Sequence, residues 1–142
     1  MEIIQRLQDK NNQEAYQLLL LLEERLAESN ELYGCFEEFL SLLNSRSAFV
    51  QVRGFRLACA QAKWDENGKL ARNLDVLLAI LDRAKPTAVR QCLAALGNAA
   101  GYRPELREGV RAKLEGLDLS RFQDSMRPLI EKDIAALKEQ CV

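Results

Sequence analysis

Apolar residues recur at intervals of three and four along almost the whole chain. The series Val89, Cys92, Leu96 and Ala99 is typical, because residues spaced in this way lie on one face of an α-helix. No stretch of useful length alternates apolar and polar residues with the period of two that a half-buried strand requires. The pattern therefore predicts an all-α protein.

Capping and breaking residues divide the chain into short helices. Asn, Ser and Asp are favoured at helix N-termini, proline is tolerated in the first turn, and glycine ends helices. On these signals the predicted helices span residues 2–9, 13–28, 31–43, from a cap at Ser45 or Ser47 to 63, 65–82, 86–100, 104–116, and from a cap at Asp124 or Ser125 to the end. Helices joined by so few residues pack as antiparallel neighbours.

A dipeptide recurs every 37 residues, as Val52-Arg53, Val89-Arg90 and Met126-Arg127. The same register carries three apolar sets, which are Ala15, Val52, Val89 and Met126, then Leu18, Phe55, Cys92 and Leu129, then Leu22, Cys59 and Leu96 with Asp133 in the last unit. These positions share one helical face, so the period predicts a buried stripe in each of four units. Tyr16 in place of the arginine, and Asp133, are departures expected of end units, whose outer faces nothing covers.

These observations predict one domain, residues 1–142, of about four antiparallel helix pairs. A chain of 142 residues is long enough to bury a core without disulfides or metals. The small residues Ala62, Ala99 and Ala136 close the second helix of each later pair, which suits close packing against the next pair.

Two segments carry a resemblance to a known family. Phe49 to Ala58 and Pro86 to Gly97 each contain a Val-Arg pair followed by small and aliphatic residues, and they resemble the second helix of a HEAT repeat. The chain is similar to a small HEAT-like protein of bacterial type from about residue 31 onward, most clearly in the two middle units. The resemblance implies a right-handed α-α superhelix that acts as a scaffold and holds a partner on the inner face, which the second helices line.

The resemblance also implies a role for the recurring arginine. In HEAT-like arrays it often pairs with an aspartate in the turn between the helices of a neighbouring unit, which forms a ladder. Here only Asp82 occupies such a turn, and Ser45 and Leu119 stand at the matching positions. The arginines are therefore expected either to find other carboxylates or to remain free to bind.

Charge is distributed unevenly, although the net charge is only −1. Residues 1–45 carry three basic and nine acidic side chains, a net charge of −6, whereas residues 46–142 carry seventeen and twelve, a net charge of +5. Such a split steers association, and it allows the acidic first pair of one copy to dock on the basic last pair of another. Solvated helix faces that happen to be uneven are the simpler interpretation.

The number and spacing of cysteines and histidines limit the kinds of metal and redox site that the chain can form. Cys35, Cys59, Cys92 and Cys141 are far apart and there is no histidine, so we expect no metal site, no cofactor and a reducing compartment. Cys59 and Cys92 fall on the apolar stripes and are expected to pack in the core. No apolar run approaches a membrane span and the N-terminal residues do not resemble a signal peptide, so we expect a cytoplasmic protein.

The candidate partner-binding residues are arginines and aromatics. Arg53, Arg90 and Arg127 occupy one register and could form a row on the inner face, with Arg56 beside Arg53, since a guanidinium suits carboxylates and phosphates. A structural role for these arginines stays open. Trp64 and Tyr102 lie at comparable bends one unit apart, where they could anchor a partner or simply pack locally.

We therefore expect a non-enzymatic scaffold or adaptor that binds a protein segment, acidic in character, along the arginine row. The alternative is a nucleic-acid-binding or DNA-glycosylase-like HEAT-repeat protein, which is less favoured because the sequence pI is 5.6. Trp64 and Asp65 are the only pair that could serve a glycosylase. Self-association through the charge asymmetry is a third alternative.

Overall fold

The computed structural model describes residues 2–142 and confirms that the protein is all-α. Within these residues there are nine α-helices, five short 3₁₀ helices and no strand. The α-helices are α1 (Glu2–Leu7), α2 (Asn12–Glu28), α3 (Phe36–Ser41), α4 (Ala48–Cys59), α5 (Lys69–Arg72), α6 (Leu74–Ala79), α7 (Pro86–Tyr102), α8 (Arg107–Glu115) and α9 (Arg127–Gln140).

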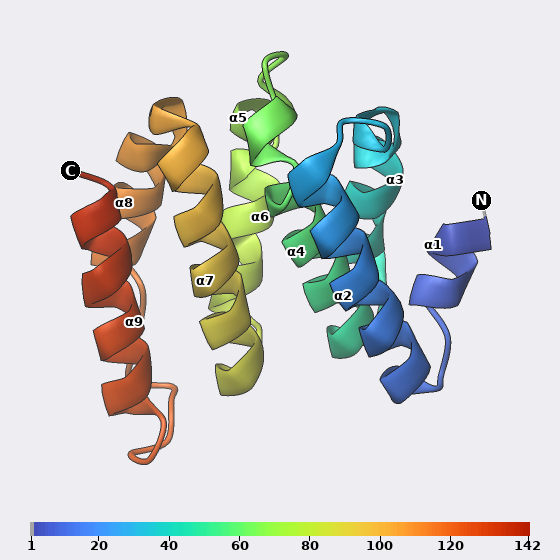
Figure 1. Ribbon diagram of the computed structural model, residues 1–142. Coiled ribbons are helices and arrows are strands. Elements are labelled where there is room, and N and C mark those ends of the chain that lie inside the picture. The colour runs from blue at the N-terminus through green and yellow to red at the C-terminus, as the bar shows by residue number, and fades with distance from the viewer. Residues whose placement is uncertain (1) are drawn as a thin grey trace.

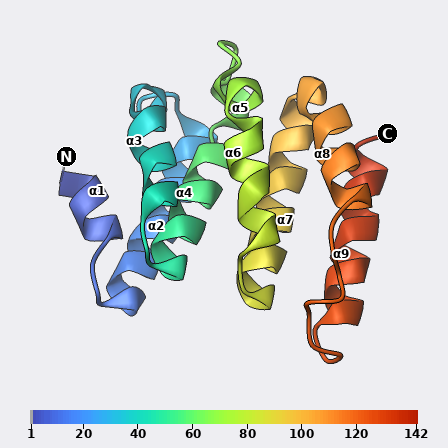
Figure 2. The same ribbon diagram turned by 180° about the vertical axis from the view of Figure 1, so that it is seen from behind.

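The helices form two layers (Figure 1). In one layer, α2, α4, α7 and α9 lie side by side, and each packs against the next. Figure 2 shows the opposite side, where α3, α6 and α8 form the second layer and run in the reverse direction. The short helix α1 packs on α2 at one end of the row. The four helices of the first layer run in the same direction, so the N-termini of α2, α4, α7 and α9 lie at the same edge.

Several predicted helix starts are confirmed. The side chain of Asn11 accepts a hydrogen bond from the Glu14 amide, and Ser47 Oγ accepts one from the Val50 amide, so these residues cap α2 and α4. Pro86 is the first residue of α7, where its missing N–H costs nothing. The sequence therefore located the main layer well.

Three predicted boundaries are wrong. The segment 31–43 begins at Tyr33 with a 3₁₀ turn, and the segment 65–82 is broken at Asn73, whose side chain donates to the Lys69 carbonyl where α5 ends. The last helix starts at Arg127 with Met126 as its N-cap, and not after a cap at Asp124 or Ser125. The Arg127 side chain donates back to the carbonyls of Leu119 and Phe122 in the preceding loop.

The predicted buried stripe is present in three units and shifts by one residue in the fourth. Ala15, Leu18 and Leu22 are buried in α2, and the matching sets are buried in α4 and α7. In α9 the buried residues are Ile130, Ile134 and Leu137, whereas Leu129 is 40% exposed. The buried face of α9 is offset by one residue from the period of 37, so the prediction that Leu129 lies in the core is wrong.

The four cysteines are free thiols. Cys59, Cys92 and Cys141 are buried and Cys35 is half-buried, so Cys59 and Cys92 pack in the core as expected. Burial raises the pKa of all four thiols, that of Cys92 to about 12. Thiols held protonated in this way behave as small apolar groups.

No helix within residues 2–142 combines the length and the apolar character that crossing a bilayer requires.

Candidate binding groove

A groove runs along α4 between α2 and α7, in the layer of parallel helices. It consists of two cavities of about 430 and 420 Å³ that meet at Gln91, which lines both. We call the first the aromatic lobe, and it is lined by Asn12, Gln13, Tyr16, Leu19, Ala48, Phe49, Val52, Arg53, Lys85, Thr87, Ala88 and Gln91. We call the second the alanine lobe, and it is lined by Glu23, Ala27, Arg56, Cys59, Ala60, Gln91, Ala94, Ala95 and Asn98.

The aromatic lobe lies at the edge where α2, α4 and α7 begin. Phe49 is in the first turn of α4 and is 62% exposed, and Tyr16 of α2 is 45% exposed. Neither residue belongs to the buried stripe, so neither packs in the core. Exposed apolar and aromatic surface at the rim of a groove is typical of interaction sites.

The alanine lobe has a different character. Four of its nine lining residues are alanines, Ala27, Ala60, Ala94 and Ala95, whose small side chains leave space between neighbouring helices. Such a surface allows another main chain to approach closely. The groove therefore combines exposed aromatic rings in one lobe with small side chains in the other.

Arg56 lies between the two lobes and is firmly held. Its Nη2 and Nε lie 2.7 and 3.0 Å from the two Glu23 carboxylate oxygens, and its Nη1 donates to Gln91 Oε1 at 2.9 Å. The guanidinium also lies over the Tyr16 ring, 5.8 Å from its centroid. The two-point pairing with Glu23 links α4 to α2, and the bond to Gln91 links α4 to α7.

Arg53 is 3% exposed and has a different set of partners. Its Nη1 donates to the Leu7 carbonyl at 2.8 Å and its Nη2 to Asn12 Oδ1 at 2.9 Å. Both acceptors are neutral, and no carboxylate oxygen within residues 2–142 lies within 4.0 Å of the guanidinium. Burial lowers the pKa of Arg53, as expected for a charge removed from water.

The other predicted arginines lie elsewhere. Arg90 of α7 pairs with Asp133 of α9, with Nε 2.6 Å from Oδ2. Arg127 pairs with Asp124 and donates to two loop carbonyls. Neither lines the groove, and both have partners within the chain itself. Asp82, the expected ladder residue, pairs with Lys113.

The two predicted aromatics are also outside the groove. Trp64 donates from Nε1 to the Leu26 carbonyl at 2.7 Å, which links the 3₁₀ turn after α4 to the last turn of α2. Tyr102 is the last residue of α7 and is 51% exposed. The aromatics of the groove, Tyr16 and Phe49, were not among the candidates, although both are apolar residues that break the stripe pattern.

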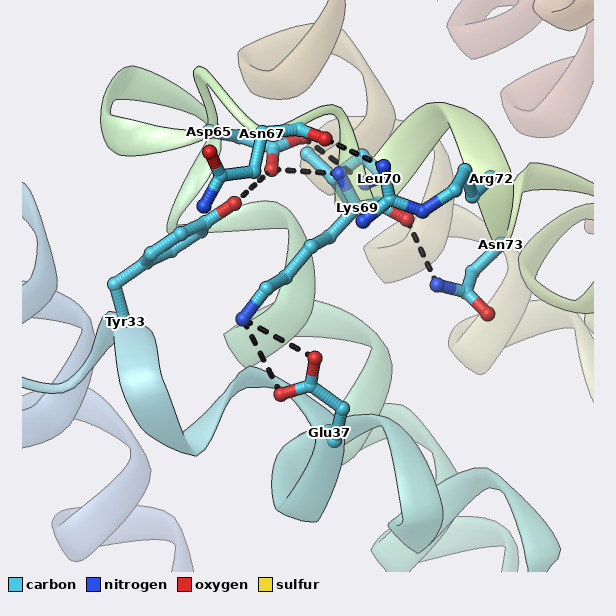
Figure 3. Close-up of polar contacts among 8 residues, drawn as sticks. All are labelled: Tyr33, Glu37, Asp65, Asn67, Lys69, Leu70, Arg72 and Asn73. Atoms are coloured by element: carbon cyan, nitrogen blue, oxygen red, sulfur yellow. Dashed lines mark hydrogen bonds and ion pairs between the residues drawn. The ribbon is translucent and has the colours of Figure 1, made fainter.

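Asp65, the carboxylate nominated for a glycosylase, is buried in a separate network (Figure 3). It accepts hydrogen bonds from the Tyr33 hydroxyl and from the amides of Lys69 and Leu70, the latter two at 2.8 and 3.0 Å. These amides begin α5, so Asp65 caps that helix. Burial and the bond to Asp65 raise the pKa of Tyr33, and the hydroxyl remains a donor.

Lys69 extends this network toward Glu37 (Figure 3). Its Nζ lies 3.1 Å from the Glu37 carboxylate and 4.4 Å from the centroid of the Tyr33 ring. The pairing with Lys69 is one reason why the pKa of Glu37 is lowered, after the bond from its own backbone amide. The network joins α3 and the turn before it to α5 and the loop before it.

Much of the basic charge in the second half of the chain is directed at main-chain carbonyls. The donors are Arg103 to Ala62 and Lys63, Arg107 to Ala100, Arg111 to Cys141, Arg121 to Leu81 and Ala84, and Arg127 to Leu119 and Phe122. Many of these carbonyls lie at or near helix ends, where no intrahelical donor is available. These guanidinium groups therefore stabilise loops and helix ends.

No group of three or more His, Cys, Asp or Glu side chains within residues 2–142 is arranged to hold a metal ion. Comparisons with protein-family models, with curated proteins and with solved structures found no match to the chain.

Proposed function

We propose that the chain is a non-enzymatic adaptor that holds a segment of a protein partner in the groove along α4. In this proposal the helices form a HEAT-like stack of four helix pairs with a right-handed superhelical course, and α2, α4, α7 and α9 provide its inner face. The observation that carries the proposal is the groove itself, since it joins exposed aromatic rings to a track of small side chains within one helical layer.

A peptide segment is the occupant that best fits the shape and chemistry of the groove. Two adjoining cavities along one helix favour an elongated ligand over a compact one. Phe49 and Tyr16 offer apolar contact, and Gln91 and Asn98 offer donors and acceptors to a main chain. Arg56 is already oriented by Glu23, so binding would order few additional side chains.

Two observations favour a protein partner over a nucleic acid or a glycosylase reaction. Arginines of the basic half donate to carbonyls of the chain itself, which leaves fewer of them for phosphates. Asp65 caps α5 with its carboxylate and Trp64 donates to Leu26, so the two side chains serve different elements.

Four free thiols favour a reducing compartment such as the cytoplasm.

The test is a groove-filling substitution with a matched control. Ala94 is exposed in the alanine lobe and Ala112 is exposed on α8 in the opposite layer. Random twelve-residue peptides displayed on phage are selected on the wild-type chain, and the enriched peptides are measured on Ala94→Trp and Ala112→Trp. We expect Ala94→Trp to abolish binding and Ala112→Trp to leave it unchanged.

Enriched peptides that bind Ala94→Trp as well as the wild type would contradict the proposal, as would a selection that enriches nothing. Duplex DNA provides the comparison for the alternative function. Binding of DNA that weakens steeply with salt would favour the nucleic-acid alternative, since phosphate contacts release counterions.

A further inference from the structure

Arg53 differs from the other arginines of its register and from its neighbour Arg56. Arg56 pairs with Glu23, Arg90 with Asp133 and Arg127 with Asp124. Arg53 is less exposed than these three, yet its two acceptors are a main-chain carbonyl and an amide oxygen. The most buried guanidinium of the register therefore lacks a negative partner among the described residues.

A buried charge without a counter-charge is costly, and neutral acceptors offset only part of that cost. Asp9 acts on Arg53 electrostatically, but it is outside ion-pair distance and its Oδ1 accepts a hydrogen bond from the Asn11 amide. Arg53 lines the aromatic lobe, so a ligand entering the lobe can supply the missing charge. The site is thus prepared for an anion.

Other features of the aromatic lobe favour the same charge. No Asp or Glu lines it. Lys85, immediately before α7, is exposed and forms no ion pair with residues 2–142. The first turns of α4 and α7 also contribute Phe49, Thr87 and Ala88 to the lining, so the positive ends of two helix dipoles point toward this edge.

The remaining lining of the lobe combines apolar side chains with the amides of Asn12, Gln13 and Gln91. Tyr16, Leu19, Phe49, Val52 and Ala88 surround a volume of about 430 Å³, which is enough for one large side chain and part of the neighbouring main chain. A simple phosphate or carboxylate would leave this apolar wall in contact with water. The lobe is therefore matched to a ligand that carries an apolar group and an anionic group side by side.

We propose that the aromatic lobe recognises an acidic residue adjacent to a large apolar residue in the bound peptide. The apolar side chain packs against Phe49, Tyr16 and Val52, and the carboxylate pairs with Arg53 and Lys85. This specificity rests on the proposed function, because it defines which peptides the groove prefers. Peptides without an acidic residue are expected to bind the groove more weakly.

The experiment compares two labelled peptides on the full chain by fluorescence anisotropy. One is an eight-residue peptide with a central Leu-Phe pair flanked by Asp and Glu, and its twin carries Asn and Gln at those places. We expect the acidic peptide to bind about tenfold more tightly, since hydrogen bonds to charged groups are the stronger ones. Its affinity should fall as salt is raised.

Variants assign the effect to the lobe. Lys85→Glu should weaken the acidic peptide about threefold to fivefold, because the pair is exposed, whereas Lys132→Glu on α9 should have no effect. Phe49→Ala should weaken the binding of both peptides, and Val76→Ala, at an exposed apolar residue on α6, should weaken neither. These four residues are on the surface, so circular dichroism should show unchanged helicity.

The outcomes separate this proposal from the one on which it rests. Equal affinity for the acidic and amide peptides, or an unchanged affinity in Lys85→Glu, would overturn the acidic preference. If the phage selection still yields peptides that Ala94→Trp excludes, the binding function stands and only the specificity is wrong. If no selected peptide is sensitive to Ala94→Trp, both proposals are wrong.

Discussion

At the scale of single residues, two buried charged side chains differ in how well their hydrogen-bond partners compensate the charge. Asp65 is 2% exposed and accepts three hydrogen bonds, two of them from the amides that begin α5. Arg53 is equally buried but donates only to neutral oxygens. The first arrangement is a complete structural cap, whereas the second leaves charge that a ligand can neutralise.

Removing the Asp65 carboxylate should destabilise the protein strongly. Asp65→Ala leaves two amides and the Tyr33 hydroxyl without their acceptor, so we expect the free energy of unfolding to fall by about 2–4 kcal/mol. Urea denaturation followed by circular dichroism measures this. The control is Asp124→Ala, whose carboxylate is almost fully exposed and whose loss should cost less than about 0.5 kcal/mol. Equal effects of the two substitutions would show that the cap contributes nothing.

At the scale of helices, the contact between α3 and α4 depends on the absence of a side chain at Gly54. A Cβ built there would lie 2.7 Å from Leu42 Cβ and 2.7 Å from the Phe39 carbonyl oxygen. One of these atoms belongs to the backbone, so the contact cannot be relieved by a side-chain rotation. Gly54 therefore sets the distance between the two layers at this point.

This contact gives a matched pair of substitutions. Gly54→Ala should lower the free energy of unfolding by about 1–3 kcal/mol through overpacking. Gly101→Ala lies in α7 with no atom within 4 Å of the added Cβ, so it should raise stability by about 0.5–1 kcal/mol through helix propensity. Thermal and urea unfolding of both variants test the prediction, and a stabilised Gly54→Ala would contradict the described packing.

The sequence predicts helices best where local chemistry decides them. Asn11, Ser47 and Pro86 start helices as expected because a cap or a proline acts within a few residues. At the start of α9, Arg127 donates to carbonyls up to eight residues earlier. Contacts of this kind leave no periodic signal in the sequence.

At the scale of the whole molecule, the groove arises from residues of three helices that are distant in sequence. Tyr16, Phe49 and Lys85 meet only because α2, α4 and α7 lie side by side with their N-termini at one edge. The period of 37 residues predicted which faces are buried, and hence much of the core. It could not predict which exposed residues from different units meet, because that depends on how the helices are arranged in space.

The buried thiols make the whole fold sensitive to alkaline pH. Thiols in the unfolded chain ionise near pH 8.5, whereas burial raises the pKa of Cys59 and Cys92 in the folded state. The unfolded state therefore loses protons that the folded state keeps, and stability falls as pH rises from about 8.5, by up to about 1.4 kcal/mol per pH unit for each thiol.

Urea denaturation between pH 8 and 10.5 tests this prediction. The double variant Cys59→Ala and Cys92→Ala should be less stable at neutral pH because of the cavities, but its stability should decline less steeply as pH rises. An unchanged slope would mean that these thiols ionise as readily in the folded protein as in the unfolded chain.

The central claim, that the face along α4 binds a protein segment, is tested most directly by amide NMR spectra of the full chain. The spectra are recorded while the acidic Leu-Phe peptide is added. We predict that shift changes concentrate on α2, α4 and the first half of α7, around Tyr16, Phe49, Arg53 and Gln91. Changes confined to α3, α6 and α8 on the opposite layer, or no changes at saturating peptide, would contradict the account.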